Sequence, residues 1–298
     1  MKLAIQAQYI KAGKITAEVK ALTRDFVKPG VGYVETCETI EKEIRSRGGS
    51  PAFPTGIGVN DVTAHYAPQE DDDSTFGESD LIKVDFGVHV DGYIADTALS
   101  VTFNPEYELM LEVTERALSA AIATAKKDPR TGEIGGEIYR EASRFGFKTI
   151  QNLTGHTLDR YVVHAGKSIP NLFMPDLPSL KKGEVFAIEP FLTLGSAAGY
   201  VVDSPAETIF SIVVHRKTGD RIQDAFAERV WADRRTLPFT PRWYSEELEE
   251  EKLQNVIRGL VKNRVMRSYP TLVEASRKPV AQFEHTMALT EEGLIVLT

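Results

Sequence analysis

Cysteine is almost absent from this sequence of 298 residues, because Cys37 is the only one. A single cysteine excludes an intramolecular disulfide and a cluster of thiolate metal ligands, and it fits a reducing compartment. The chain also lacks a run of about 18 apolar residues, so no transmembrane helix is predicted. The N-terminal sequence MKLAIQAQYIKAGK has no long apolar core of the kind found in signal peptides. We therefore expect a soluble, cytoplasmic protein that does not bind membranes.

Basic residues are too few to form a broad positive surface. The chain has 35 Lys and Arg against 43 Asp and Glu, which gives a formal net charge of -8. This balance argues against a nucleic-acid-binding protein that relies on basic charge. Hydrophobic residues make up 42% of the chain and charged residues 26%, so the chain can bury a substantial core. Its length suits one large domain or two ordinary ones.

Residues 81–103, LIKVDFGVHVDGYIADTALSVTF, predict a β-hairpin. Two runs rich in Val, Ile, Phe and Thr flank Asp91-Gly92, and this dipeptide favours a type I′ turn because both residues tolerate positive φ. A two-residue turn places Gly87 opposite Asp96. Asp85 lies on the same face as Gly87, because side chains alternate along a strand. Asp85 and Asp96 are therefore predicted to be diagonal neighbours, with Cα atoms about 7–8 Å apart.

Two carboxylates on one face of an apolar hairpin repel each other and lose solvation. A pair of divalent metal ions would offset this cost. The alternative is an ordinary hairpin with two acids facing solvent, and the hairpin sequence alone leaves both interpretations open.

The remainder of the chain predicts an α+β fold in which helices and strands are grouped. The expected helices, from apolar spacing and Gly or Pro breaks, cover about residues 3–27, 33–47, 106–127, 134–145 and 245–264. The helix at 134–145 is expected to follow a break at Thr131-Gly132. A second strand-rich half begins near residue 148, and the chain closes with two strands around a Glu-Glu-Gly turn.

Five residues in or beside predicted strands are candidate metal ligands. They comprise four carboxylates and one imidazole: Asp85, Asp96, His156, Glu189 and Glu284. Such a hard donor set suits Mn, Fe, Co or Zn. Four negative charges can balance two divalent ions, which in two-metal hydrolases lie about 3.5–4 Å apart. Spacing along the chain does not show that the five side chains meet.

The segments KVDFG, DGYIADTA, NLTGHTLDRYVVHAG, AIEPF and AQFEHT, in this order, resemble the methionine aminopeptidases of the pita-bread fold, a family of M24 metallopeptidases. The long segment between AIEPF and AQFEHT resembles the insert of the type II branch, and the short N-terminus resembles its archaeal form. The resemblance implies antiparallel sheets flanked by helices, with a catalytic domain at residues 1–194 and 278–298. It also implies a helical, winged-helix-like insert at residues 195–277.

The resemblance further implies a metal-dependent hydrolase that removes the N-terminal methionine from nascent proteins and peptides and prefers a small second residue. The nucleophile would be a hydroxide that bridges two divalent ions (Co, Mn, Fe or Zn). Asp85 would bind one ion, Asp96 and Glu284 would bridge both, and His156 and Glu189 would complete the shell of the other.

The same resemblance implies roles around the metal centre. His65 would lie beside the scissile bond, and His164 would contact the substrate. From the ligand set we further expect Glu189 to carry a proton from the nucleophile to the leaving amine. Phe53 and Tyr269 would line the methionine pocket.

Structural roles are expected for the other histidines, His89, His215 and His285. The expected partners are nascent polypeptide N-termini at the ribosome, and the enzyme is expected to be a monomer.

Three other functions are considered. The first is a pita-bread peptidase that acts on Xaa-Pro peptides, but the extra N-terminal domain usual in those enzymes is not seen. The second is a non-catalytic pita-bread protein that binds at the ribosome, which the intact ligand set disfavours. The third is a nucleic-acid-binding module built on the insert, which its acidic EELEEE run disfavours.

Overall fold

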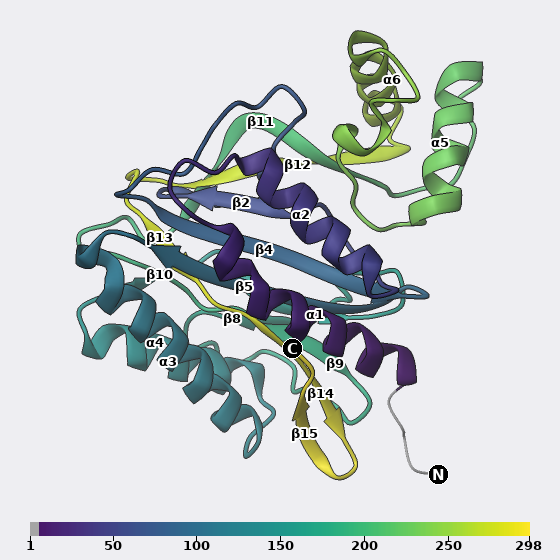
Figure 1. Ribbon diagram of the computed structural model, residues 1–298. Helices are drawn as coiled ribbons and strands as arrows, with labels where there is room; N and C mark the ends of the chain where they lie inside the picture. The colour runs from purple at the N-terminus through teal and green to yellow at the C-terminus, as the bar shows by residue number, and fades with distance from the viewer. Residues whose placement is uncertain (1–5) are drawn as a thin grey trace.

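The computed structural model describes residues 6–298, and the predicted hairpin lies in the middle of it (Figure 1). Strands β4 (Leu81–Val90) and β5 (Tyr93–Thr102) pair in antiparallel fashion, and Gly87 is opposite Asp96. Asp91 and Gly92 have φ values of 52° and 85°, as the predicted turn requires. The predicted register is therefore confirmed.

Antiparallel sheets make up the β structure, and each contains strands that are distant in sequence. One sheet has the order β1-β4-β2, with β5 paired to β4, and another has the order β15-β14-β9-β7-β8. Two three-stranded sheets have the orders β13-β10-β6 and β11-β12-β3. The remaining strand bounds are β1 Ser50–Pro51, β2 Gly56–Val59, β3 Val62–Ala64, β6 Lys148–Thr149, β7 Thr154–Leu158, β8 Ser168–Pro170, β9 Val185–Ile188, β10 Phe191–Thr193, β11 Val201–Ile212, β12 Met266–Glu274, β13 Val280–Gln282, β14 His285–Thr290 and β15 Gly293–Val296.

Two pairs of helices cover the sheets. Helices α1 (Ala7–Phe26) and α2 (Tyr33–Ser46) lie along the sheet that contains β4, whereas α3 (Glu108–Ala125) and α4 (Thr131–Arg144) pack together beside β8 and β13 (Figure 1). The predicted start of the first helix at residue 3 lies outside the described residues. Within residues 6–298, no helix has the length and apolarity needed to cross a membrane.

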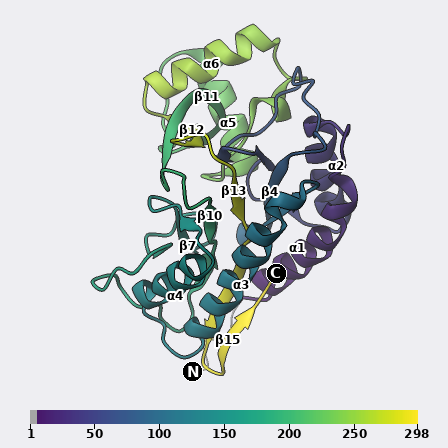
Figure 2. The same cartoon turned by 90° about the vertical axis from the view of Figure 1, so that its left-hand side faces the viewer.

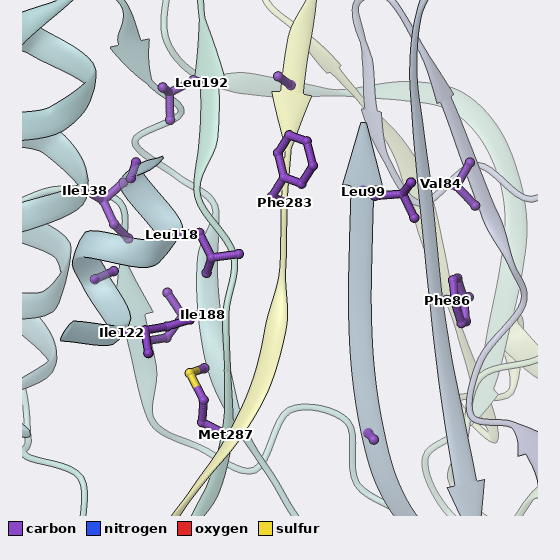
Figure 3. Close-up of a cluster of buried hydrophobic side chains, with 14 of the residues drawn as sticks. Val84, Phe86, Leu99, Leu118, Ile122, Ile138, Ile188, Leu192, Phe283 and Met287 are labelled. Atoms are coloured by element: carbon purple, nitrogen blue, oxygen red, sulfur yellow. The ribbon is translucent and has the colours of Figure 1, made fainter. Parts of the chain in front are cut away.

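The main hydrophobic core joins these layers. Phe86 and Leu99 project from the hairpin, Leu118 projects from α3, and Phe283 lies between the two groups (Figure 3). All four side chains are buried. Burying an aliphatic or aromatic side chain contributes about 1.5–3 kcal/mol, so this core holds the hairpin against the helices.

The predicted helix break at Thr131-Gly132 was wrong, because α4 begins at Thr131. Gly132 is needed there for close packing: a Cβ atom at this position would lie 1.8 Å from the carbonyl oxygen of Met174. The glycine therefore permits close approach to a distant segment and does not end a helix. The helix predicted at 106–127 consists of a 3₁₀ turn, Pro105–Tyr107, followed by α3.

The segment at residues 195–277 contributes both strands and helices. Strand β12 pairs with β11 and with β3, so β11 and β12 form one sheet with a strand from the N-terminal part of the chain. Helices α5 (Arg221–Arg234) and α6 (Glu250–Lys262), with the 3₁₀ turn η2 (Pro241–Tyr244), pack around a separate hydrophobic cluster at the upper end of the molecule in Figure 2. The division into a catalytic domain and an insert stays a prediction.

Helix α5 was missed by the sequence analysis, and α6 is shorter than predicted. Few side chains of α5 are apolar and buried, chiefly Phe226, Ala227 and Val230, so its periodic signal is weak. Asp220 supplies the start signal, because its side chain accepts hydrogen bonds from the backbone N–H groups of Ile222 and Gln223.

A buried ion pair fastens this segment to α2. Arg242 of η2 donates to Glu41 of α2 with an Nη2–Oε1 distance of 2.9 Å, and Trp243 donates to the other carboxylate oxygen at 2.7 Å. Both side chains of the pair are at most 5% exposed. The half-exposed Arg45 lies 4.0 Å from Glu41, which is farther than Arg242.

We expect Arg242→Met to destabilise the protein by about 3–5 kcal/mol, because the Glu41 carboxylate would stay buried without its main counterion. Urea denaturation followed by fluorescence measures this free energy of unfolding. The double variant Glu41→Leu/Arg242→Met should recover much of the loss, since it removes both charges together.

The matched control is Arg229→Met. Arg229 pairs with Glu247 at 3.0 Å, but both side chains are well exposed, so its loss should cost less than about 1 kcal/mol. Equal effects of the two arginine substitutions would contradict the role assigned to the buried pair.

Candidate active site

The structure brings the five candidate ligands together. Asp85 and Asp96 lie on the hairpin, and His156 lies on β7. Glu189 directly follows β9, and Glu284 directly precedes β14. One ligand atom from each of Asp96, His156 and Glu284 lies within 4.8 Å of the others. His156 Nε2 is 3.5 Å from Glu189 Oε1 and 3.9 Å from Asp96 Oδ2. Residues separated by about 200 positions in sequence thus form one cluster.

Asp96, Glu189 and Glu284 are buried, Asp85 is half-buried, and the four carboxylates are poorly compensated. Asp85 Oδ1, Asp96 Oδ1 and Glu284 Oε1 are buried without a hydrogen-bond partner among the described residues. Burial raises the pKa of Asp85 to about 7, and burial together with the neighbouring carboxylates raises the pKa values of Asp96, Glu189 and Glu284 well above their usual range. Buried charges of one sign with free oxygen atoms fit a site built for divalent cations.

Gln282 is a further member of this cluster that sequence analysis did not single out. Its side-chain amide donates to Asp85 Oδ2 at 3.3 Å and to Glu189 Oε2 at 3.2 Å. Gln282 lies two residues before Glu284 in the AQFEHT segment, so the alternation of side chains along a strand was a signal for it. The amide holds two candidate ligands in a fixed relative orientation.

The raised carboxyl pKa values predict how metal-free protein responds to pH. The unfolded carboxyl groups ionise near pH 4, whereas folded Asp85 ionises near pH 7. Below pH 4 the Asp85 carboxyl group is protonated in both the folded and the unfolded protein. Between pH 4 and pH 7 only the unfolded protein loses this proton, so this group lowers the free energy of unfolding as pH rises. We expect this carboxyl contribution to the stability of chelator-treated protein to fall by on the order of 2–3 kcal/mol between about pH 5 and pH 7. The buried histidines, whose pKa values are lowered, contribute a slope of opposite sign below about pH 6.5, so a carboxyl variant is needed to isolate the carboxyl contribution.

Thermal unfolding of the chelated protein across this pH range tests the expectation. Adding Mn²⁺ should raise the melting temperature more at pH 7 than at pH 5, because the ion competes with protons for the same oxygen atoms. Asp96→Asn removes one of the carboxyl groups whose pKa is raised, so the stability of this variant relative to the wild type should increase from pH 5 to pH 7. A difference between the two chelated proteins that stays constant over this pH range would contradict the prediction.

A cavity of about 230 Å³ lies over the carboxylate cluster. The predicted substrate-binding residues His65, His164, Phe53 and Tyr269 all line it. Apart from the five candidate ligands, the other lining residues are apolar or uncharged: Ala64, Asn152, Leu153, Thr154, Val163, Phe191, Ile209 and Pro238. Sequence analysis did not select Ile209 and Pro238, which come from the 195–277 segment. The cavity thus has an acidic floor and largely apolar walls.

Phe53 is seated against the hairpin backbone. A Cβ atom at Gly87 would lie 2.5 Å from Phe53 Cε1, so the ring occupies the space that any larger residue would need. Because Gly87 is opposite Asp96, this contact places an apolar ring beside a candidate metal ligand.

Two imidazoles face the cavity in neutral form. Burial is the main cause that lowers the pKa of His65 below its usual value and the pKa of His164 to about 4. The ring of His164 is 4.3 Å from that of His156, and the ring of His65 is 5.7 Å from that of Tyr269. Neutral imidazole offers one N–H donor and one acceptor nitrogen. His65 also has a φ of 63°, an uncommon conformation that fixes the direction of its side chain.

The other three histidines make local contacts away from the carboxylate cluster. His89 Nδ1 accepts a hydrogen bond from the backbone N–H of Gly92. His215 stacks on Trp231 and lies 3.1 Å from Glu228. His285 Nδ1 is 3.0 Å from the Thr298 hydroxyl. These contacts agree with structural roles.

Comparison with known proteins gives a consistent set of matches. The model of metallopeptidase family M24 matches residues 7–291. A methionine aminopeptidase from Pyrococcus horikoshii is 39% identical over 292 residues, and the match covers 97% of this chain and 98% of that protein.

Solved structures share the fold. A structure described as a thermophilic Arx1 matches with a TM-score of 0.82 and 17% identity, over 99% of this chain and 91% of that chain. The methionine aminopeptidase from Thermotoga maritima matches with a TM-score of 0.70 and 22% identity, over 100% of this chain and 99% of that chain. At these identities the structural matches establish the fold alone, and they agree with the predicted pita-bread architecture.

Proposed function

The chain belongs to metallopeptidase family M24, and we propose that it removes the N-terminal methionine from peptides and nascent proteins. The observation that carries this proposal is the meeting of Asp85, Asp96, His156, Glu189 and Glu284 beneath a largely apolar cavity. The near-full-length match to proteins named methionine aminopeptidase supports the choice of substrate.

We propose that these five residues hold two divalent metal ions. Four carboxylates balance two divalent charges, and the unpartnered oxygen atoms of Asp85, Asp96 and Glu284 are available as ligands. Co, Mn, Fe and Zn all suit these donors. Divalent ions held by these residues would supply a water molecule of lowered pKa and would polarise the scissile carbonyl group.

The remaining steps of the proposed mechanism rest on side chains of the chain itself. Glu189 accepts the proton of the attacking water and passes it to the leaving amine, as a general base and then a general acid. His65 and His164 donate hydrogen bonds to the oxyanion that develops at the scissile carbonyl. Their neutral state at pH 7 leaves each with one N–H group for this purpose.

Phe53 and Tyr269 are proposed to contact the methionine side chain. An apolar pocket discriminates by only about 1–3 kcal/mol per methylene group, so shape alone gives a moderate preference for methionine. The proposed preference for a small second residue would come from crowding near His65, whose ring lies 5.7 Å from that of Tyr269 on the cavity wall.

We also propose that the enzyme acts as a monomer in the cytoplasm, on nascent chains at the ribosome. The single cysteine, which is buried and unpaired, supports a reducing compartment.

Methionine release from a Met-Ala-Ser peptide tests the proposed function. Protein stripped of metal and then supplied with Mn, Co, Fe or Zn should release free methionine, and an Ala-Pro-Ser peptide should stay intact. Cleavage of the proline peptide alone would replace the substrate with that of an Xaa-Pro peptidase. Two bound ions without cleavage of either peptide would favour a binding protein.

A further inference from the structure

A second hollow, of about 220 Å³, adjoins the catalytic cavity. The two share four lining residues, Val163, His164, Pro238 and Tyr269, so they lie on either side of a common rim. The rest of the second hollow is lined by side chains of the loop after β7 and of the 195–277 segment: Tyr161, Val162, Ile212, Val213, Thr236 and Arg267. The proposed reaction uses His164 and Tyr269 at the shared rim but none of these six residues.

The charge of the second hollow differs from that of the metal site. Among the described residues that line it, Arg267 is the one permanently charged side chain, and none is a carboxylate. The positive charge of Arg267 also contributes to the lowered pKa of His164, which indicates that the two side chains lie near each other. A ligand that extends from the catalytic cavity would therefore meet positive potential here.

Arg267 is held in place but has free donors. Its Nε donates to the Tyr269 hydroxyl at 2.9 Å, and its Cζ lies 4.9 Å from the centre of the Tyr269 ring. Neither Nη1 nor Nη2 has a hydrogen-bond partner among residues 6–298. A guanidinium fixed through Nε presents its two terminal nitrogens as a pair, the geometry that binds a carboxylate.

The distances indicate which part of a substrate reaches Arg267. The His65 and Tyr269 rings are 5.7 Å apart, and the Arg267 guanidinium is 4.9 Å from the Tyr269 ring, so His65 and Arg267 are separated by at most the sum of these distances. An extended chain spans about 3.3–3.6 Å per residue, so this separation corresponds to at most about three residues. A peptide whose scissile bond lies at His65 would place its third or fourth residue at Arg267.

We propose that this second hollow is a binding subsite for the substrate chain beyond its second residue, and that Arg267 selects an acidic side chain at the third or fourth position. The inference rests on the proposed aminopeptidase function. Val162, Ile212 and Val213 cover the methylene groups of a glutamate while the guanidinium binds its carboxylate.

The test compares kcat/KM for Met-Ala peptides that carry Glu, Gln or Lys at position three or four. Wild-type enzyme is expected to prefer Glu over Lys by about three- to tenfold at low ionic strength, and the preference should shrink with added salt, because an exposed ion pair is modest and screened. Arg267→Gln should bring the ratio to about one, and Arg267→Glu should reverse it. Each ratio compares two peptides on one enzyme, so any change in catalysis transmitted through Tyr269 cancels.

The matched control is Arg258→Gln, which removes an exposed arginine of α6 whose hydrogen bonds within residues 6–298 are to Gln254 and Asn255. It should keep the wild-type ratio. A wild-type ratio near one, or a preference that persists in Arg267→Gln, would overturn the inference while methionine release continues. Absence of methionine release from every peptide would overturn the proposed function itself. The wild-type peptide series decides the inference even if a variant folds poorly.

Discussion

Glu284→Gln is expected to lose at least one of the two proposed metal ions and to lower kcat/KM by about 10³-fold or more. Glu284 is 1% exposed, one of its carboxylate oxygens has no hydrogen-bond partner among the described residues, and it lies with Asp96 and His156 in the tightest part of the cluster. A bound ion stabilises a transition state by several kcal/mol, and each 1.36 kcal/mol is a factor of ten in rate. The amide keeps the shape of the side chain but removes the charge that balances the metal.

Metal content per chain, measured by mass spectrometry after dialysis, and methionine release together test this prediction. The control is Glu207→Gln, the same change on β11, where the Glu207 carboxylate is exposed and accepts a hydrogen bond from Ser268. This control should keep its metal and activity. If Glu284→Gln protein retained two tightly bound ions, Glu284 would not have the bridging role that the resemblance implies.

Replacing His65 is expected to reduce kcat by about 10²–10³-fold while metal content stays unchanged. This is the size of effect found when one donor to an oxyanion is lost. Because His65 has a φ of 63°, His65→Asn is the better substitution: asparagine tolerates this backbone conformation, whereas alanine would add strain. The asparagine side chain is shorter and cannot reproduce the position of the imidazole N–H.

His215→Asn provides the control, since His215 stacks on Trp231 and pairs with Glu228 at a distance from the cavity. Its kcat should equal that of the wild type. Loss of metal from His65→Asn would instead assign His65 to the ligand shell. A pH–rate profile adds a second readout, because removal of an oxyanion donor lowers the whole profile without moving its limbs.

Sequence alone was most informative where neighbouring residues decide the structure. The Asp91-Gly92 turn requires positive φ at both residues, and this local requirement determined the register of β4 and β5 and the common face of Asp85 and Asp96. Ordered motifs also identified the family, because five of them occur in a fixed order between residues 83 and 286. By contrast, the role of Gly132 was misinterpreted. A glycine is required there because the carbonyl group of Met174, more than 40 residues away in sequence, packs against its Cα atom.

What this sequence determined by itself was therefore the class of fold, the family, and the residue types able to hold divalent metal. Only the tertiary structure decided which distant side chains meet: Gln282 between Asp85 and Glu189, and Arg267 beside Tyr269 at the rim of the cavity. The physical reason is the separation in sequence over which each interaction acts. Turn chemistry and strand alternation act over a few residues, whereas the contacts of Gln282 with Asp85 and Glu189 depend on how separate sheets pack, which no local pattern encodes.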